Sequence, residues 1–174
     1  MNHPQPQQGH KKTGIVMLVI AWGILLVLVG VFFDDLLGQQ QNPNQAPVSA
    51  FSSTGMKEVR LLPNRQHHYV LSGFINDVGV EFLLDTGATD VVIPQGLAKE
   101  IGLVAGRKSY ASTANGTITV FRTTLDTVNL GNIQLTDISA SINPAMHGNV
   151  VLLGMSALKQ IEFSQRGDTL ILRQ

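Results

Sequence analysis

The strongest constraint on the fold of this chain is a run of twenty uncharged residues, 14–33, with the sequence GIVMLVIAWGILLVLVGVFF. At about 1.5 Å per residue, a helix of this length spans roughly 30 Å, the thickness of the hydrocarbon core of a bilayer. Backbone groups inside lipid have to pair within their own segment, so the run is expected to be helical. The sequence therefore predicts one transmembrane helix over residues 14–33, in contact with membrane lipid.

Two other structures could contain such an apolar run. A cleaved signal peptide has an apolar core of about 7–15 residues that ends in small residues before the cleavage site. This run is longer and ends in Phe32-Phe33-Asp34-Asp35. A buried helix of a soluble domain would show an amphipathic face, which this run lacks. An uncleaved anchor is therefore favoured over both alternatives.

The residues on either side of the apolar run predict its orientation and its connection to the rest of the chain. Lys11 and Lys12 precede the run, and the positive-inside rule places them in the cytoplasm. Residues 1–13 are then a cytoplasmic tail, and the C-terminal bulk of a single-pass inner-membrane protein lies in the periplasm or another extracytoplasmic space. Residues 34–55 are rich in Gln, Asn, Pro, Ser and Ala, which predicts a flexible linker.

Composition excludes several classes of function for the remaining residues, 56–174. Twelve Lys and Arg balance twelve Asp and Glu, so the chain lacks the basic field that attracts a phosphate backbone, and no nucleic-acid partner is expected. The chain contains no cysteine, which excludes disulfides, thiolate zinc sites and a cysteine nucleophile. The length suits one domain.

Short apolar runs separated by turn signals predict an all-β domain over residues 56–174. Asn76-Asp77 and Asn115-Gly116 are predicted as two-residue hairpin turns. Pro94 and Gly102 bound a short predicted helix, 95–101, and a second one is expected over 155–160. The expected strands are 68–75, 78–84, 91–93, 108–113, 117–125, 127–130, 133–135, 138–142, 150–153, 161–163 and 169–172. Many short strands at this spacing favour a closed or folded-over β-domain.

One tetrapeptide is the main candidate for chemistry. Asp85-Thr86-Gly87-Ala88 follows the apolar run Phe82-Leu83-Leu84 directly. An aspartate in that position is costly unless it is hydrogen-bonded or has a chemical role. Asp-Thr-Gly alone is also common in ordinary turns. Its surroundings favour a site, because a β-branched run, 91–93, follows it and a second apolar run, 150–154, later ends in glycine.

Together these motifs resemble the retropepsin-like aspartic proteases, and most closely their bacterial membrane-anchored branch. The resemblance rests on Leu84 to Ala88, on Thr113-Ala114-Asn115-Gly116 in a predicted hairpin, and on Leu152-Leu153-Gly154-Met155-Ser156. It covers residues 56–174 and includes the amino-terminal anchor. The resemblance implies a single-lobe, closed all-β domain of the retropepsin type, with one or two short helices, preceded by one transmembrane helix.

The resemblance also implies a mechanism and a set of roles. Two aspartates hold one water between them, and because the chain has one Asp-Thr-Gly, the implied enzyme is a homodimer with Asp85 from each protomer. Its substrate is a peptide or protein, and neither a metal nor another cofactor is required. The Thr86 hydroxyl would bond across the dimer, and Gly87 and Ala88 would complete the loop. Residues 113–116 (Thr113, Ala114, Asn115 and Gly116) would form a flap over the substrate, and Leu152, Leu153 and Gly154 would support the loop from beneath.

Weaker signals suggest other functions. His67, His68 and His147 could bind a metal, but adjacent histidines on a strand point to opposite faces and chelate poorly. Ser72 and Ser156 lack the surroundings of a nucleophile elbow, which argues against a serine hydrolase. The main alternative to an endopeptidase is the same β-fold acting as a non-catalytic peptide-binding or assembly module on a membrane anchor.

Overall fold

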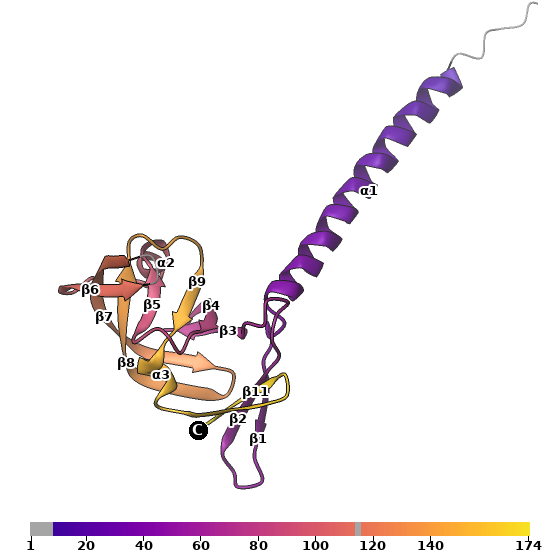
Figure 1. Ribbon diagram of the computed structural model, residues 1–174. Helices are drawn as coiled ribbons and strands as arrows, with labels where there is room; N and C mark the ends of the chain where they lie inside the picture. The colour runs from indigo at the N-terminus through magenta and orange to yellow at the C-terminus, as the bar shows by residue number, and fades with distance from the viewer. Residues whose placement is uncertain (1–8, 114–115) are drawn as a thin grey trace, which may run out of the picture. The chain divides into compact units, whose positions relative to one another are not determined.

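A computed structural model describes residues 9–113 and 116–174, and the chain divides after Gly38 into two compact units (Figure 1). The first unit consists of most of helix α1 (Gly9–Gln41). In the described part of the chain, α1 supplies one segment, Gly14–Gln41, that is long and apolar enough to cross a membrane, with a mean hydropathy of 3.0. Such a helix is compatible with a membrane span or with a signal sequence. It continues past the predicted end at Phe33.

The second unit, residues 39–174, is built almost entirely of strands. Its helices are short: α2 (Gln95–Ile101) and α3 (Met155–Leu158). Its strands are β1 (Val48–Phe51), β2 (Lys57–Leu61), β3 (Val70–Ile75), β4 (Val78–Leu84), β5 (Val91–Pro94), β6 (Lys108–Thr113), β7 (Gly116–Leu130), β8 (Ile133–Asn143), β9 (Val150–Leu153), β10 (Glu162–Arg166) and β11 (Thr169–Arg173).

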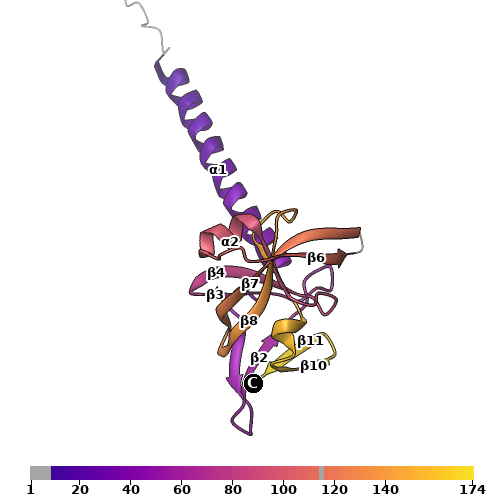
Figure 2. The ribbon, with the colours of Figure 1, turned by 90° about the vertical axis from the view of Figure 1, so that its left-hand side faces the viewer.

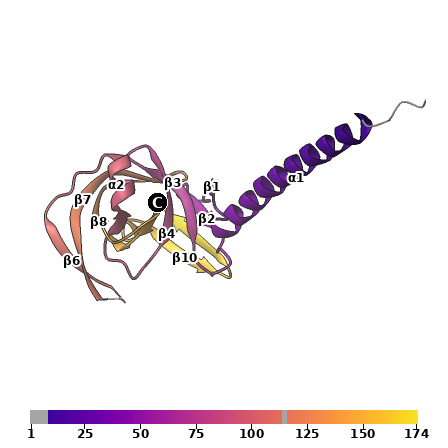
Figure 3. The same ribbon diagram turned by 90° about the horizontal axis from the view of Figure 1, so that it is seen from above.

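These strands form two sheets in the described part of the chain. The larger sheet has the order β3-β4-β9-β5-β8-β7-β6, and an additional pairing of β3 with β7 closes it on itself (Figures 2 and 3). The smaller sheet has the order β1-β2-β11-β10. Within the larger sheet β4 and β9 run parallel, with Leu84 opposite Leu153. The predicted class, a closed all-β domain with short helices after one apolar helix, is confirmed.

The turn between β3 and β4 forms as the sequence predicts. Asn76 and Asp77 have positive φ angles of 47° and 66°, which is the backbone that a two-residue type I′ hairpin requires and that Asn and Asp adopt readily. The Asn76 side chain also accepts a hydrogen bond from the Thr127 backbone N–H, at 3.0 Å. This bond attaches the hairpin to β7, next to the β3–β7 pairing that closes the sheet.

Helix α2 also begins and ends at the predicted residues. Pro94 precedes it, with a φ of −57° that suits a helix start, and Gly102 ends it with a φ of 80° in the left-handed region. The Gly102 N–H donates to the last carbonyls of the helix, so its end is satisfied without side chains.

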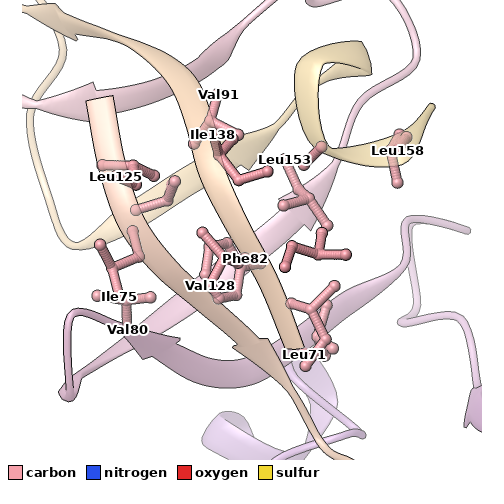
Figure 4. Close-up of a cluster of buried hydrophobic side chains, with 14 of the residues drawn as sticks. Leu71, Ile75, Val80, Phe82, Val91, Leu125, Val128, Ile138, Leu153 and Leu158 are labelled. Carbon is pink, nitrogen blue, oxygen red and sulfur yellow. The ribbon is translucent and has the colours of Figure 1, made fainter. Parts of the chain in front are cut away.

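The core of the second unit consists of aliphatic side chains and one phenylalanine that the closed sheet surrounds. Burying each large side chain contributes roughly 1.5–3 kcal/mol of favourable transfer free energy. The residues drawn together in Figure 4 include Leu71, Ile75, Val80, Phe82, Val91, Leu125, Val128, Ile138, Leu153 and Leu158. Because Phe82 and Leu153 come from the two strands beside Asp85, the core holds the base of the Asp85 loop directly.

The predicted flexible linker over residues 34–55 is wrong for most of its length. Helix α1 continues to Gln41, and residues 48–51 form strand β1, which pairs with β2. Between them, Asn44 is buried, and its side-chain amide donates to the carbonyls of Leu62 and Val70 at 2.8 and 2.6 Å while its oxygen accepts from the Leu62 N–H at 2.8 Å. Residues 42–51 are therefore part of the folded domain, which begins well before residue 56.

Several other boundaries differ from the prediction. Strand β2 lies in residues that the sequence leaves without a predicted element. The separate strands predicted at 117–125 and 127–130 are one long strand, β7, and those at 133–135 and 138–142 are one strand, β8. Residues 121–130 of β7 pair with β8 in a single register, from Leu130–Ile133 to Phe121–Ile142. This register continues across the polar residues that seemed to separate the predicted strands.

A buried glutamate on the smaller sheet forms ion pairs with two arginines that remain partly exposed. Glu58 on β2 is only 4% exposed, and its two carboxylate oxygens accept hydrogen bonds from Arg60 Nε at 2.7 Å and Arg173 Nε at 2.9 Å. Glu58 lies directly opposite Arg173 across the β2–β11 pairing. Hydrogen bonds from Arg60 and then Arg173 stabilise the charged form and lower the pKa of Glu58 below its ordinary value of 4.5.

We predict that these ion pairs make the stability of the domain depend on pH. Because the pKa of Glu58 is lower in the folded chain than in the unfolded one, its contribution is fully present above about pH 4.5 and is lost as the pH falls through the lowered value. At pH 7, thermal melts of Glu58→Gln should therefore show a lower Tm than the parent. As the pH falls from 6 through the lowered pKa of Glu58, the Tm of Glu58→Gln should decrease by less than the Tm of the parent. The matched control is Glu100→Gln, an exposed carboxylate on α2. Equal pH dependence in the parent and in Glu58→Gln would contradict the prediction.

Candidate active site

The candidate catalytic residue, Asp85, is the first residue after strand β4. Its backbone N–H donates to the carbonyl of Leu153 at 3.2 Å, which extends the parallel β4–β9 pairing by one step. Its carboxylate Oδ1 accepts from the Gly87 N–H at 2.8 Å, and its carbonyl accepts from the Ala88 N–H at 3.2 Å. Asp85 is half-buried, while Thr86 and Gly87 are exposed. The carboxylate is thus fixed by backbone bonds and remains accessible at one side.

The start of helix α3 holds the far end of the same loop. The Met155 N–H donates to the Ala88 carbonyl at 2.8 Å, and the Ser156 N–H donates to the Thr89 carbonyl at 2.9 Å. The first N–H groups of a helix have no partners inside it, so they are free to bind a neighbouring segment. The late apolar run and the short helix after it therefore lie against the Asp85 loop.

Gly154 is the point of closest approach between these two segments. A side chain at residue 154 would collide with the carbonyl oxygen of Asp90 and would lie 2.7 Å from the carbonyl oxygen of Ala88. Both contacts are backbone atoms, which cannot move aside without displacing the loop. Gly154 has an extended backbone with a φ of −85°, so the requirement for glycine here comes from space and not from backbone conformation.

Three serines fix the last residues of the loop: Ser156, which belongs to the late motif of the sequence, and Ser139 and Ser141, which no sequence motif marks. Ser156 is buried, and its hydroxyl accepts from the Val91 N–H at 3.0 Å and donates to the Ser139 carbonyl at 2.7 Å. Ser139 and Ser141 donate to the two carboxylate oxygens of Asp90 at 3.2 and 3.3 Å. These bonds join the loop to β8. Alternate serines on β8 are the signal in the sequence, but it becomes readable only when β5 is known to pair with β8.

The predicted flap, Thr113 to Gly116, corresponds to the hairpin between β6 and β7. Thr113 lies opposite Gly116, and its hydroxyl donates to the Gly116 carbonyl at 2.8 Å. Gly116 has a φ of 110°, which favours glycine. Ala114 and Asn115 lie outside the described residues. The hairpin extends away from the rest of the domain (Figures 1 and 3), and its strands belong to the same sheet as β4, which leads into the Asp85 loop.

The other acidic residues lie in different surroundings. Asp77 is in the exposed β3–β4 turn, and Asp126 and Asp137 are exposed on β7 and β8. The carboxylate of Asp90 is held by the serines of β8. Asp90 is not part of a second Asp-Thr-Gly, since the sequence has only one. One chain therefore supplies one carboxylate with the geometry of the Asp85 loop.

The alternative sites find no further support in the structure. Among the described residues, no group of three or more His, Cys, Asp and Glu side chains is close enough to hold a metal ion. His67 has a positive φ of 60° in the turn before β3, and His147 lies in the loop before β9. Ser156 is buried beneath the Asp85 loop, where its hydroxyl is engaged by backbone groups.

Comparison with known proteins agrees with this geometry. A family model described as gag-polyprotein putative aspartyl protease matches residues 71–160, which run from β3 to the end of α3. An uncharacterized protein encoded in the cobV 5′ region of a Sinorhizobium species is 30% identical over 172 residues, covering 92% of this chain and 73% of the relative. An uncharacterized protein of Rickettsia prowazekii is 27% identical over 124 residues, covering 69% of this chain and 53% of that protein.

A solved structure gives the same fold. The crystal structure of a retropepsin-like aspartic protease from Rickettsia conorii superposes with a TM-score of 0.55 at 24% identity, covering 73% of this chain and 94% of the other. The chain therefore belongs to the aspartyl protease family that the gag-polyprotein model describes, and its domain has the retropepsin-like fold. The resemblance drawn from the Asp85, hairpin and Leu152–Ser156 motifs is confirmed.

We predict that adding one methyl group at residue 154 disrupts the Asp85 loop. Gly154→Ala would push its Cβ into two carbonyl oxygens, and overpacking of this kind typically costs about 1–3 kcal/mol. Thermal unfolding should show the lower stability, and amide exchange should increase at Ala88, Met155 and Ser156 more than in the core.

The control is Gly96→Ala, on helix α2, where a Cβ would meet nothing within 4 Å. That substitution should leave stability unchanged or raise it slightly, because alanine favours a helix. Equal stability and equal exchange for Gly154→Ala and Gly96→Ala would show that Gly154 does not set the loop.

Proposed function

We propose that this protein is a homodimeric aspartic endopeptidase in which Asp85 of each protomer contributes one of the two catalytic carboxylates. The observation that carries the proposal is the Asp85 loop itself. Its backbone is tied to β9 and α3, its carboxylate is oriented by the Gly87 N–H, and one side of it stays accessible. Membership of an aspartyl protease family supports peptide-bond hydrolysis as the reaction.

The dimer follows from the need for a second carboxylate. The sequence has one Asp-Thr-Gly, and the other aspartates considered, Asp77, Asp126, Asp137 and Asp90, lie in a turn, on exposed strand positions or against serines. A second copy related by a two-fold axis through the site supplies an identical loop, and such isologous contacts are the commonest form of oligomer. The Thr86 hydroxyl is exposed and available to bond across the axis, as the family resemblance implies.

The reaction needs only the two carboxylates and a water. Two carboxyl groups that share a site cannot both ionise at low cost, so they hold one proton between them. The ionised carboxylate takes a proton from the bound water, which attacks the scissile carbonyl, and the protonated one donates a hydrogen bond to the carbonyl oxygen. Proton transfer to the leaving nitrogen then completes hydrolysis and returns the pair to its starting state.

The parts around the two carboxylates have roles that follow from their positions. Gly87 is exposed and without a side chain, so substrate backbone can approach the carboxylates. The β6–β7 hairpin, Thr113 to Gly116, is the flap that closes over the peptide and excludes water. Leu152, Leu153 and Gly154 support the loop from the β9 side. Substrate binds in an extended conformation and pairs its backbone with the flap and the loop.

We further propose that α1 is an uncleaved membrane anchor, with residues 1–13 in the cytoplasm and the protease domain in the periplasm or another extracytoplasmic space. The supporting observations are the length and apolarity of the helix and the position of Lys11 and Lys12 before it. Confinement to a membrane raises the effective concentration of protomers, which favours pairing of two incomplete sites.

We predict that Asp85→Asn abolishes peptide cleavage. The amide keeps the shape of the carboxylate and can still accept from the Gly87 N–H, but it cannot exchange a proton with water. Cleavage of a peptide library by the full chain in detergent micelles should fall by at least about 10²–10⁴-fold.

The matched control is Asp77→Asn, in a turn whose positive φ suits asparagine as well as aspartate. It should cleave like the parent. If Asp85→Asn cleaves as well as the parent, the endopeptidase proposal is wrong. If no variant cleaves any peptide while the dimer forms, the fold serves as a non-catalytic peptide-binding module.

A further inference from the structure

A groove of about 540 Å³ lies on the domain away from the Asp85 loop. Three cross-strand pairs of the β3–β4 hairpin contribute to its lining: Ser72 with Glu81, Gly73 with Val80, and Phe74 with Gly79. Glu100 of helix α2 also lines it, and α2 lies near the hairpin in Figure 2. A volume in this range is typical of ligand-binding clefts.

The groove and the candidate active site lie toward opposite ends of strand β4. Glu81 is four residues before Asp85, and at roughly 3.3 Å per residue the two are about 13 Å apart along the strand. Asp85 and the residues of its loop are not among the lining residues. An occupant of the groove would therefore leave the carboxylate of Asp85 uncovered.

The charge of the groove is negative. Of the lining residues that the structure describes, Glu81 and Glu100 are ionisable, and none is Lys, Arg or His. The carboxylate of Glu81 is held in place, because its Oε1 accepts from the Asn42 side-chain amide at 2.9 Å and Asn42 is buried, with 1% of its surface exposed. Asn42 also donates to the Ser72 hydroxyl at 3.0 Å, which fixes a second lining group.

The groove also has an apolar surface. Phe74 is 50% exposed, so its ring adds apolar surface that an occupant of the groove could cover. Pro47 and Leu97 line the groove as well. Pro47 comes from the segment after α1, whose place in the domain depends on the buried Asn44. The groove therefore exists only because residues 42–51 are folded onto the domain.

We propose that this groove is a docking site for an extended peptide segment that carries Lys or Arg beside an apolar side chain. The basic group would pair with Glu81 and Glu100, and the apolar side chain would cover the exposed ring of Phe74. Pairing of opposite charge and burial of the exposed ring select one kind of occupant, a basic and apolar peptide. We take this peptide to be part of a protein substrate that is held here while another part of it reaches Asp85. This last step rests on the proposed function.

The experiment measures peptide binding without cleavage. The full chain carrying Asp85→Asn, in nonionic detergent micelles, is titrated against a fluorescein-labelled peptide of alternating Arg and Leu, and anisotropy is recorded. Adding Glu81→Gln and Glu100→Gln should weaken binding by about tenfold, because both charges that face the basic peptide are lost. Glutamine at residue 81 can still accept from Asn42, so the fold is kept.

Two controls make the result specific. Glu162→Gln removes an exposed carboxylate from β10, in the smaller sheet, and should leave binding unchanged. A peptide of alternating Glu and Leu should bind at least about tenfold more weakly than the basic one. Equal binding by the double variant and the parent, or equal binding of acidic and basic peptides, would overturn the proposal. Displacement by free arginine amide at the concentration of the peptide would also overturn it, because a single cation would then be the ligand.

Binding and catalysis are tested separately. If the basic peptide binds in this groove and the parent cleaves nothing, the docking site stands and the endopeptidase proposal fails. If the parent cleaves peptides and the double variant binds the basic peptide like the parent, the endopeptidase proposal stands and the docking site fails.

Discussion

The close packing of Gly154 against the Ala88 and Asp90 carbonyls is the contact on which the candidate site depends. It brings the end of β9 and the start of α3 against the loop after β4, so that the N–H groups of α3 can bind the loop carbonyls. The parallel pairing of β4 with β9 leads both strands to this point, and their buried side chains, Phe82 and Leu153, are part of one core. The Asp85 carboxylate is thus positioned by backbone contacts that a side chain at residue 154 would break.

Much of this arrangement could be predicted from local sequence, and the reasons are physical. The Asn76-Asp77 turn, the Pro94 and Gly102 boundaries of α2, and the strand that leads into Asp85 each depend on residues adjacent in the chain. Long-range contacts could not be predicted in the same way. Strand β1 and the buried Asn44 have the composition of a linker. Their place in the fold depends on partners later in the chain, which are strand β2 for β1, and Leu62 and Val70 for Asn44.

The residues of the candidate site also differ in whether local sequence identifies them. Asp85 and its loop could be identified from the sequence pattern and the family resemblance, and the chain does belong to that family. Ser139 and Ser141 could not, because a lone serine has no signal until the pairing of β5 with β8 brings it to the loop. The groove beside Glu81 could not be predicted from the sequence either, because its lining residues come from segments far apart in the chain.

The central claim is that two Asp85 carboxylates from different protomers form one active site. The direct test mixes the parent with Asp85→Asn in detergent, allows the protomers to exchange at a fixed total concentration, and follows peptide cleavage as the parent fraction changes. If a mixed dimer is inactive, activity falls with the square of that fraction, so an equal mixture retains about a quarter of the parent activity. Activity in direct proportion to the parent fraction, about half at equal mixing, would mean that each chain carries a complete site and would contradict the account.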